Sequence, residues 1–242
     1  MEKRVILYMG PEFPEKIKDL AEIIWTPILT IKPIEGCSIS FINNLDNCDC
    51  IAFTSPRGPK ILIEDSKKFN LFNLIIEEIS NKKISAVGKE TAESVSKYLG
   101  KKIDIIPKTF TGYNLAIELS RSNCKCVLLA RSQQGIKEIN SVLKNNKVKY
   151  IEVSLYEEII NNENLTKIRN ILKDKKVDYM ILSSPLIAEN VCKEIKEINN
   201  VKIFSIGITT YRKAKEICPD KNIIVPDQYS LESVARFIQN YG

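Results

Sequence analysis

Runs of apolar residues alternate with amphipathic segments along most of the chain, as in proteins whose strands and helices alternate. Near the N-terminus, residues 4–8 (RVILY) predict a buried strand, 14–23 a helix favoured by its first proline, and 24–31 a second strand. The same order returns later, where strands at 125–131 and 148–156 flank a predicted helix. The chain is therefore expected to contain two βαβ segments.

A stretch that spans residues 84–107 has a second copy at 203–226. Each copy begins with an apolar run that ends on a glycine, continues through a predicted helix, and closes with a short strand and a proline. The shared positions are Gly88 and Gly207, then Thr91 and Thr210, and finally Pro107 and Pro226. Glycine at a helix start lets a ligand or a neighbouring backbone approach unpaired N–H groups, and such a helix start suits an anion. A tight strand-to-helix turn explains these glycines equally well, so both interpretations stay open.

Two further predicted strands, at 50–56 (CIAFTSP) and 179–185 (YMILSSP), both end in Ser-Pro. With them the whole chain divides into two equivalent series of elements, which we interpret as an internal duplication. The alternation predicts an α/β fold with parallel sheets covered on both faces, and such sheets bind ligands at the carboxyl ends of their strands. The candidate substrate-binding residues at those ends are Thr54, Ser55, Arg57, Gly88, Lys89, Thr91, Arg131, Ser132, Ser183, Ser184, Gly207, Thr209 and Thr210.

Missing nucleotide-binding motifs and the net charge limit the classes of ligand that the protein is expected to bind. The sequence lacks the Gly-x-Gly-x-x-Gly and Gly-x-x-x-x-Gly-Lys motifs of familiar nucleotide sites. Its net charge of +6 is too mild for nucleic-acid binding without a concentrated basic patch, and an acidic small molecule fits better. No apolar run reaches the length of a membrane span, and the N-terminal run is too short for a signal peptide, so we expect a cytoplasmic protein without membrane contact.

The chain has seven cysteines and no histidine. In a cytoplasmic protein the cysteines are expected to be reduced thiols. Cys48-x-Cys50 and Cys124-x-Cys126 lack the usual spacing of metal ligands, so we expect no metal, and each pair should pack as small apolar groups on one strand face. Acid–base chemistry must then use Tyr, Lys, Asp, Glu or water.

Six short segments resemble one enzyme family in their order and spacing. They are Thr26-Pro27, Phe53-Thr54-Ser55-Pro56-Arg57, Ala86-Val87-Gly88-Lys89-Glu90-Thr91, Leu155-Tyr156, Ser183-Ser184-Pro185 and Ile206-Gly207-Ile208-Thr209-Thr210. Over nearly its whole length the chain is similar to uroporphyrinogen-III synthase. That cofactor-free enzyme of heme biosynthesis closes the linear tetrapyrrole hydroxymethylbilane into a macrocycle, with inversion of the last ring and loss of water.

The resemblance implies two similar doubly wound α/β domains joined by extended linkers at 33–40 and 153–163. One domain would combine residues 1–32 with 164–242, and the other would be 41–152. The N-terminal βαβ would then complete the C-terminal domain, a choice that the internal repeat alone leaves open. We expect a monomer that binds hydroxymethylbilane and needs no metal or other cofactor. A non-catalytic two-lobed module that binds a small polyanionic ligand is the alternative.

The resemblance also assigns roles to single residues. Tyr156 matches a tyrosine proposed, in similar enzymes, to help the substrate's terminal hydroxyl leave, and a phenol is protonated at neutral pH. A packing role for this aromatic residue stays open. Helix-start amides and the cations Arg57, Lys89 and Arg131 suit the substrate's carboxylates. The chain departs from the family at Glu90, which puts a negative charge beside this proposed anion site.

Overall fold

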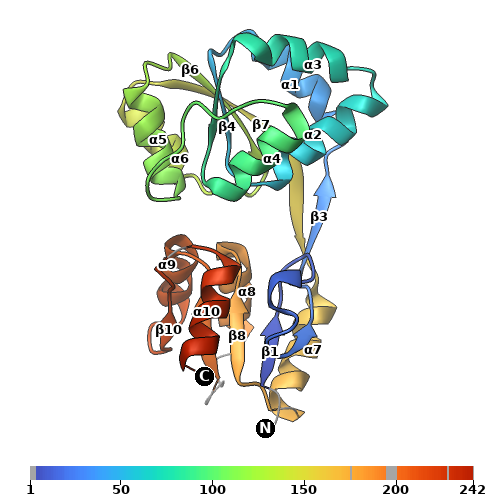
Figure 1. Cartoon of the computed structure of the whole chain (residues 1–242), viewed down its shortest axis with the longest axis vertical. Helices are drawn as coiled ribbons and strands as arrows, with labels where there is room; N and C mark the ends of the chain where they lie inside the picture. Colours follow the sequence, from blue (N-terminus) through green and yellow to red (C-terminus); the bar gives the residue numbers. More distant parts are fainter. Residues whose placement is uncertain (1–3, 175, 195–200, 228, 242) are drawn as a thin grey trace. The chain divides into compact units, whose positions relative to one another are not determined.

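The computed structural model divides into two compact units. Unit 1 combines Met1–Thr30 with Ile159–Gly242, and unit 2 is Ile31–Glu158. The structure describes residues 4–174, 176–194, 201–227 and 229–241. Each unit contains a five-stranded sheet with helices on its faces (Figure 1).

In unit 1 the sheet has the strand order β10-β9-β8-β1-β2, and each pair of neighbouring strands is parallel. The strands are β1 (Val5–Tyr8), β2 (Glu22–Trp25), β8 (Tyr179–Leu182), β9 (Lys202–Ser205) and β10 (Ile223–Ile224). One face packs against α7 (Asn162–Asp174), α8 (Pro185–Glu194) and α9 (Ile208–Ile217), and the other against the 3-10 helix η1 (Glu15–Ile17) and α10 (Leu231–Tyr241). Leu7 faces the first helix layer and Ile6 the second, as alternation along a strand requires.

In unit 2 the sheet has the order β3-β7-β6-β4-β5, and the pairs among β4 to β7 are parallel. The strands are β3 (Leu29–Pro33), β4 (Cys50–Phe53), β5 (Lys83–Ala86), β6 (Cys126–Ser132) and β7 (Lys149–Ile160). One face is covered by α1 (Cys37–Leu45), α2 (Arg57–Lys68), α3 (Phe72–Glu78), η2 (Ile79–Asn81) and α4 (Lys89–Leu99). The other face is covered by α5 (Gly112–Arg121) and α6 (Glu138–Asn145), which Figure 1 shows on the opposite side of the strands. Both units are thus doubly wound, and the predicted fold class is confirmed.

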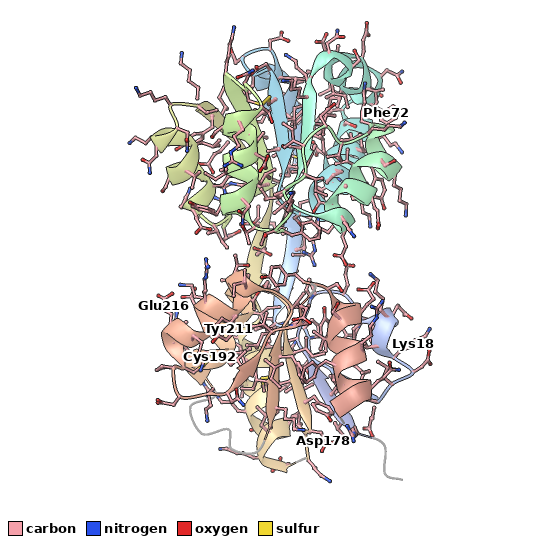
Figure 2. All side chains as sticks on the ribbon, turned by 60° about the vertical axis from the view of Figure 1, so that its left-hand side comes forward. Lys18, Phe72, Asp178, Cys192, Tyr211 and Glu216 are labelled. Atoms are coloured by element: carbon pink, nitrogen blue, oxygen red, sulfur yellow. A yellow bond between two sulfur atoms is a disulfide. The ribbon has the colours of Figure 1, made fainter. Side chains whose placement is uncertain are left out.

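The duplication is visible at the amino ends of the strands as well. Asp178, just before β8, accepts a hydrogen bond from the Val5 N–H of β1 at 2.8 Å, and Figure 2 shows Asp178 at that end of the unit. Asp49, just before β4, accepts one from the Cys126 N–H of β6 at 2.8 Å. In unit 1, β1 therefore occupies the place that β6 has in unit 2, next to the strand that ends in Ser-Pro.

The N-terminal segment differs from its predicted elements. The helix expected at 14–23 is wrong: residues 15–17 form the 3-10 helix η1, residues 18–21 form turns and a bend, and residues from Glu22 onward pair with β1. The single strand expected at 24–31 is two strands, β2 in unit 1 and β3 in unit 2. Pro27, which has no backbone N–H, lies in the break between them.

Parts of the two expected linkers have regular structure. Residues 37–40 of the segment 33–40 form the start of α1, after Gly36 in the left-handed conformation at φ 74°. Residues 153–160 of the segment 153–163 belong to β7. The chain passes from one unit to the other within β3 and within β7.

The prediction of seven reduced thiols is wrong for six cysteines. Disulfides join Cys48 to Cys126, Cys50 to Cys124, and Cys192 to Cys218, whose Cα atoms lie 4.5, 5.9 and 5.9 Å apart. These separations lie within the range that a disulfide requires. Cys48 precedes β4 and packs on the face opposite to Cys50, so the expectation that this pair shares a face is also wrong. Spacing along the chain cannot show which cysteines meet across neighbouring strands.

Candidate functional site

Polar groups gather at the carboxyl edge of the unit 2 sheet, beginning at the end of β4. Thr54 and Ser55 follow this strand directly and are half-buried, and Arg57 is the first residue of α2. The Ser55 Oγ accepts a hydrogen bond from the Arg57 backbone N–H at 3.3 Å, which fixes the turn. A Cβ on Gly58 would lie 3.2 Å from the Phe53 ring, so glycine lets α2 pack closely on the sheet. The turn places hydroxyl groups and a guanidinium where parallel sheets bind ligands.

Tyr156 comes close to this turn through an irregularity in β7. Arg131 of β6 lies opposite Ser154, but the next residue, Ser132, lies opposite Tyr156. Leu155 is therefore an extra residue in β7, and such a bulge changes the direction of the side chains that follow. Leu155 and Tyr156 are only 0% and 2% exposed, so the tyrosine lies inside unit 2 among apolar side chains.

Burial raises the pKa of the Tyr156 phenol above its ordinary value. Ser55 and Arg57 interact with the phenol and lower its pKa, while the nearby charge of Glu158 raises it further. The phenol is therefore protonated at neutral pH. It is a weaker acid than a tyrosine in water, and it lies almost out of reach of solvent.

Glu158 belongs to the same group and was missed by the sequence analysis. It lies two residues beyond Tyr156 in β7, on the same face of the strand. Its Oε2 accepts a hydrogen bond from the Ser132 Oγ at 3.2 Å, and its backbone N–H donates to the Gln134 Oε1 at 2.9 Å. Burial raises the pKa of the Glu158 carboxyl, although the charge of Arg57 and the hydrogen bond from Ser132 act in the opposite direction.

We call this group the β7 cluster; its members are Ser55, Arg57, Ser132, Tyr156 and Glu158. A sequence signal for Glu158 exists in retrospect, because two polar-tipped side chains two apart on a strand must share a face. This pattern was overlooked because Glu157 and Glu158 lie in the segment 153–163, which was interpreted as a solvent-exposed linker.

Arg131 lies at the carboxyl end of β6, as predicted, and its guanidinium has partners inside unit 2. It is 2% exposed, and its guanidinium donates to Glu152 Oε2 at 2.5 and 3.1 Å, to Asn140 Oδ1 at 2.7 Å and to Ile136 O at 2.8 Å. Burial works against the charged form of Glu152, but Arg131 outweighs it and the pKa of Glu152 is lowered. Arg131 therefore ties β6 to β7 and to α6, and these contacts satisfy it inside the unit.

The two repeated glycines each lie against an aromatic ring. A Cβ on Gly88 would lie 3.1 Å from the ring of Phe110, and one on Gly207 would lie 3.4 Å from Tyr229. Both glycines have an extended backbone that any residue adopts, with φ of −168° and −157°. The adjacent ring therefore explains Gly88, whereas a Cβ at Gly207 would make only an ordinary van der Waals contact. Both rings come three residues after the repeated prolines, a further element of the duplication that the sequence carried.

The repeated threonines lie at the starts of α4 and α9. Thr91 is 2% exposed and Thr210 is 4% exposed, so both hydroxyl groups are turned into their units. Lys89 is exposed at the first position of α4, and Thr209 is half-buried near the start of α9. Lys89 and Thr209 are therefore the more accessible of the predicted side chains at these helix starts.

Unit 1 presents a smaller set of polar groups at the carboxyl edge of its sheet. The Ser184 Oγ accepts a hydrogen bond from the Ile187 N–H at 3.2 Å and so caps α8, while Ser183 is half-buried beside it. Gly207 and Thr209 follow the neighbouring strand β9. The structure thus groups the predicted residues at one edge of each sheet.

Within the described ranges, no three His, Cys, Asp or Glu side chains come together in a way that could hold a metal ion. Among the same residues, no helix is both long and apolar enough to cross a membrane.

Comparison with known proteins decides which family this site belongs to. The sequence matches the family described as "Uroporphyrinogen-III synthase HemD" over residues 15–236. The chain belongs to the uroporphyrinogen-III synthase family. It is therefore an enzyme of porphyrin biosynthesis, a cyclising lyase.

Individual relatives agree with this family. The chain is 28% identical over 210 residues to a protein of Methanocaldococcus jannaschii that is provisionally named uroporphyrinogen-III synthase, covering 81% of this chain and 80% of that one. It is 25% identical over 221 residues to the uroporphyrinogen-III synthase of Chlorobaculum parvum, covering 88% and 86%. A mutant Thermus thermophilus uroporphyrinogen III synthase has the same fold, with a TM-score of 0.68, 14% identity, and 98% and 97% of the two chains covered.

Proposed function

We propose that this member of the family cyclises hydroxymethylbilane to uroporphyrinogen III, with inversion of the last ring and loss of water. The observation that carries the proposal is the family match over residues 15–236, joined to a cluster of polar groups at the carboxyl edge of unit 2. We further propose that the two units serve as the two domains of the enzyme. Nothing in the comparisons favours a non-catalytic binding module.

Substrate carboxylates are proposed to bind at the two sheet edges. Arg57 and the exposed Lys89 supply positive charge in unit 2, and helix-start amides with Ser183 and Thr209 supply donors in unit 1. At an effective dielectric constant of about 20, one close ion contact is worth up to about 4 kcal/mol before desolvation is subtracted. Two or three such contacts suffice to orient a polyanion. Arg131 is left out of this set because its donors are used inside unit 2.

Loss of the substrate hydroxyl needs a proton, and the β7 cluster is the proposed source. Tyr156 is the residue that the family resemblance points to. Its 2% exposure and its interactions with Ser55 and Arg57 suit it to positioning the cluster. After water has left, the pyrroles of the substrate are reactive by themselves. The remaining task of the protein is to hold the last ring so that it attacks through its substituted carbon, and such positioning supplies several kcal/mol of selectivity.

All residues proposed for binding and for the proton step come from one chain, so a monomer is sufficient for the reaction. No step in this scheme requires a metal or another cofactor. A chelator is therefore expected to leave turnover unchanged.

The test is to incubate the purified protein with hydroxymethylbilane and to separate the uroporphyrinogen isomers, with and without EDTA. Heat-inactivated protein is the control for closure without the enzyme. Isomer III as the main product is expected in both conditions. Isomer I alone, which is the product of closure without inversion, would overturn the proposed function. Binding of the substrate without turnover would support the two-lobed binding module instead.

A further inference from the structure

We propose that Glu158 is the group that gives its proton to the departing hydroxyl of the substrate, while Tyr156 and Ser132 hold it in position. This inference rests on the proposed function, because it assigns a step of that same reaction. Neither the family match nor the relatives name this residue. It follows from the bulge in β7, which puts Tyr156 opposite Ser132 and brings Glu158 within hydrogen-bond distance of Ser132.

Accessibility separates the two acidic members of the cluster. Tyr156 is only 2% exposed and packs with the apolar core of unit 2. Glu158 is two residues further along β7, half-buried, and on the same face of the strand. A proton donor must come within about 2.6–3.2 Å of the atom that receives the proton. Of the two groups, Glu158 is the one that substrate can reach without displacing the core.

The surroundings of Glu158 fix its position and act on its charge in opposite directions. Ser132 of β6 donates to its Oε2 at 3.2 Å, and the backbone N–H of Glu158 is fixed by the Gln134 side chain. Arg57 of α2 is the charged group that faces it from the neighbouring helix, and Tyr156 is the titratable group that faces it from β7. Burial raises the pKa of this carboxyl and outweighs Arg57 and Ser132. A raised pKa increases the fraction of Glu158 that holds a proton at a given pH, relative to an exposed glutamate.

The proposed step balances. The bond between carbon and oxygen in the hydroxymethyl group breaks, and its electron pair goes to the oxygen, which takes the Glu158 proton and leaves as water. Ring electrons of the adjacent pyrrole form the new double bond to this carbon, and the lone pair of the pyrrole nitrogen moves into the ring to replace them, which gives a protonated azafulvene beside the Glu158 carboxylate. When the last ring closes the macrocycle, one ring carbon loses a proton. The carboxylate takes up this proton, so Glu158 returns to its acid form and the net loss is one water.

Glu157 provides a matched control on the same strand. It points to the other face, where its Oε1 pairs with the Lys32 Nζ at 2.9 Å, and it is not part of the β7 cluster. Glu157→Gln and Glu158→Gln remove the same charge one position apart. Glu158→Gln keeps an oxygen that can accept the Ser132 hydrogen bond but carries no acidic proton.

The experiment measures kcat, KM and isomer ratio for both variants between pH 5 and pH 9, after subtraction of closure without enzyme. Glu158→Gln is expected to lower kcat about a hundredfold with KM within about threefold of wild type. The wild-type kcat should fall as pH rises through the Glu158 pKa, because the acid form is the active one, and this fall should disappear in Glu158→Gln. Glu157→Gln should match wild type throughout.

Other outcomes contradict the proposal. A Glu158→Gln enzyme with wild-type kcat, with only KM raised, or with a low kcat that keeps the wild-type pH profile would show that Glu158 has a binding or structural role. If this variant does not fold, Glu158→Asp decides, since it should keep a reduced kcat with the alkaline fall still present. Wild-type protein that forms only isomer I would overturn the proposed function, and this proposal with it.

Discussion

Arg57 and Arg131 both follow or end a buried strand at the carboxyl edge of unit 2, and their sequence positions give no reason to treat them differently. The structure separates them by their partners. The Arg131 guanidinium donates hydrogen bonds to Glu152, Asn140 and a backbone carbonyl. Arg57 instead interacts with Tyr156 and Glu158 in the β7 cluster. A buried arginine with one carboxylate partner is costly to disrupt, because removal of either member leaves an uncompensated charge. Charge at an edge therefore identifies a ligand site only once its internal partners are known.

Tyr156→Phe tests the positioning role of the phenol. The phenylalanine ring fills the same buried space, so the fold should persist, but the interactions with Ser55 and Arg57 are lost. We expect kcat to fall about fivefold while isomer III stays the main product, since one hydrogen bond contributes about 1 kcal/mol. Tyr150→Phe, which changes another tyrosine of β7, is the control and should be silent. An unchanged rate, or a shift of the product to isomer I, would contradict this role.

The reactivity of the cysteine side chains gives a second prediction about single residues. The structure leaves Cys37 as the free thiol among the described residues, and burial, with the nearby Asp65 charge, raises its pKa to about 12. A thiol reagent at pH 8 should therefore find no reactive group in the native protein. It should find one thiol per chain after denaturation without reductant and seven after reduction. Seven thiols before reduction would contradict the three disulfides.

Single carboxylates also fix whole elements, as Asp65 shows. It lies in α2, is 3% exposed, and accepts hydrogen bonds from the Ser38 N–H at 2.8 Å, the Ser38 Oγ at 2.6 Å and the Gly36 N–H at 3.1 Å. These N–H groups lie at the start of α1, where a negative charge also complements the helix dipole. Burial works against the charged form, but the hydrogen bonds outweigh it and lower the pKa of Asp65. The carboxylate thus links α1 to α2.

Asp65→Asn should lower the free energy of unfolding by about 2 kcal/mol at pH 7, because hydrogen bonds to a charged acceptor are lost. A folded pKa below the unfolded value gives stability that is present above the unfolded pKa of about 3.9 and is lost as pH falls through the folded pKa. The difference between variant and wild type should therefore shrink below pH 4. Urea unfolding at pH 7 and pH 3 measures it. Asp46→Asn, on an exposed residue at the end of α1, is the control. A difference that is equal at both pH values would contradict the charge as its cause.

For the whole molecule, the sequence predicted the repeated series of strands and helices, and with them the two parallel sheets. It could not predict that β1 pairs with β8, because the internal repeat fits either pairing, and only the family resemblance favoured this one. Contacts between segments that are distant in the sequence could not be predicted either, because they depend on the same choice of strand pairing. The bulge at Leu155 and the partners of Cys48 and Cys50 depend on which strands become neighbours. Glu158 was missed because a charged pair before an apolar pair looks like the end of a linker.

The pairing of β1 with β8 predicts how the chain can be divided. Unit 2 is one continuous segment, 31–158, and unit 1 can be made by joining residues 1–30 to 159–242 with a short flexible linker. The join is feasible because the Asn161 N–H donates to the Ile28 carbonyl at 2.8 Å, so the cut ends lie close together. Since each unit has its own core on both faces of its sheet, each should unfold cooperatively in urea. Neither alone should form isomer III, because the proposed substrate contacts are divided between them.

Residues 159–242 expressed without 1–30 are the decisive control. This fragment lacks β1 and β2, so it loses Ile6 and Leu7, both 0% exposed, from an interior strand of the sheet. Full burial of one such side chain is worth about 1.5–3 kcal/mol, and a whole domain has only about 5–15 kcal/mol of net stability. The exposed edge of β8 would add unpaired backbone groups to that loss. We therefore expect no cooperative transition from the fragment, and recovery of the transition when residues 1–30 are joined to it. A fragment 159–242 that unfolds as cooperatively as the joined chain would show that the N-terminal strands are not part of this domain.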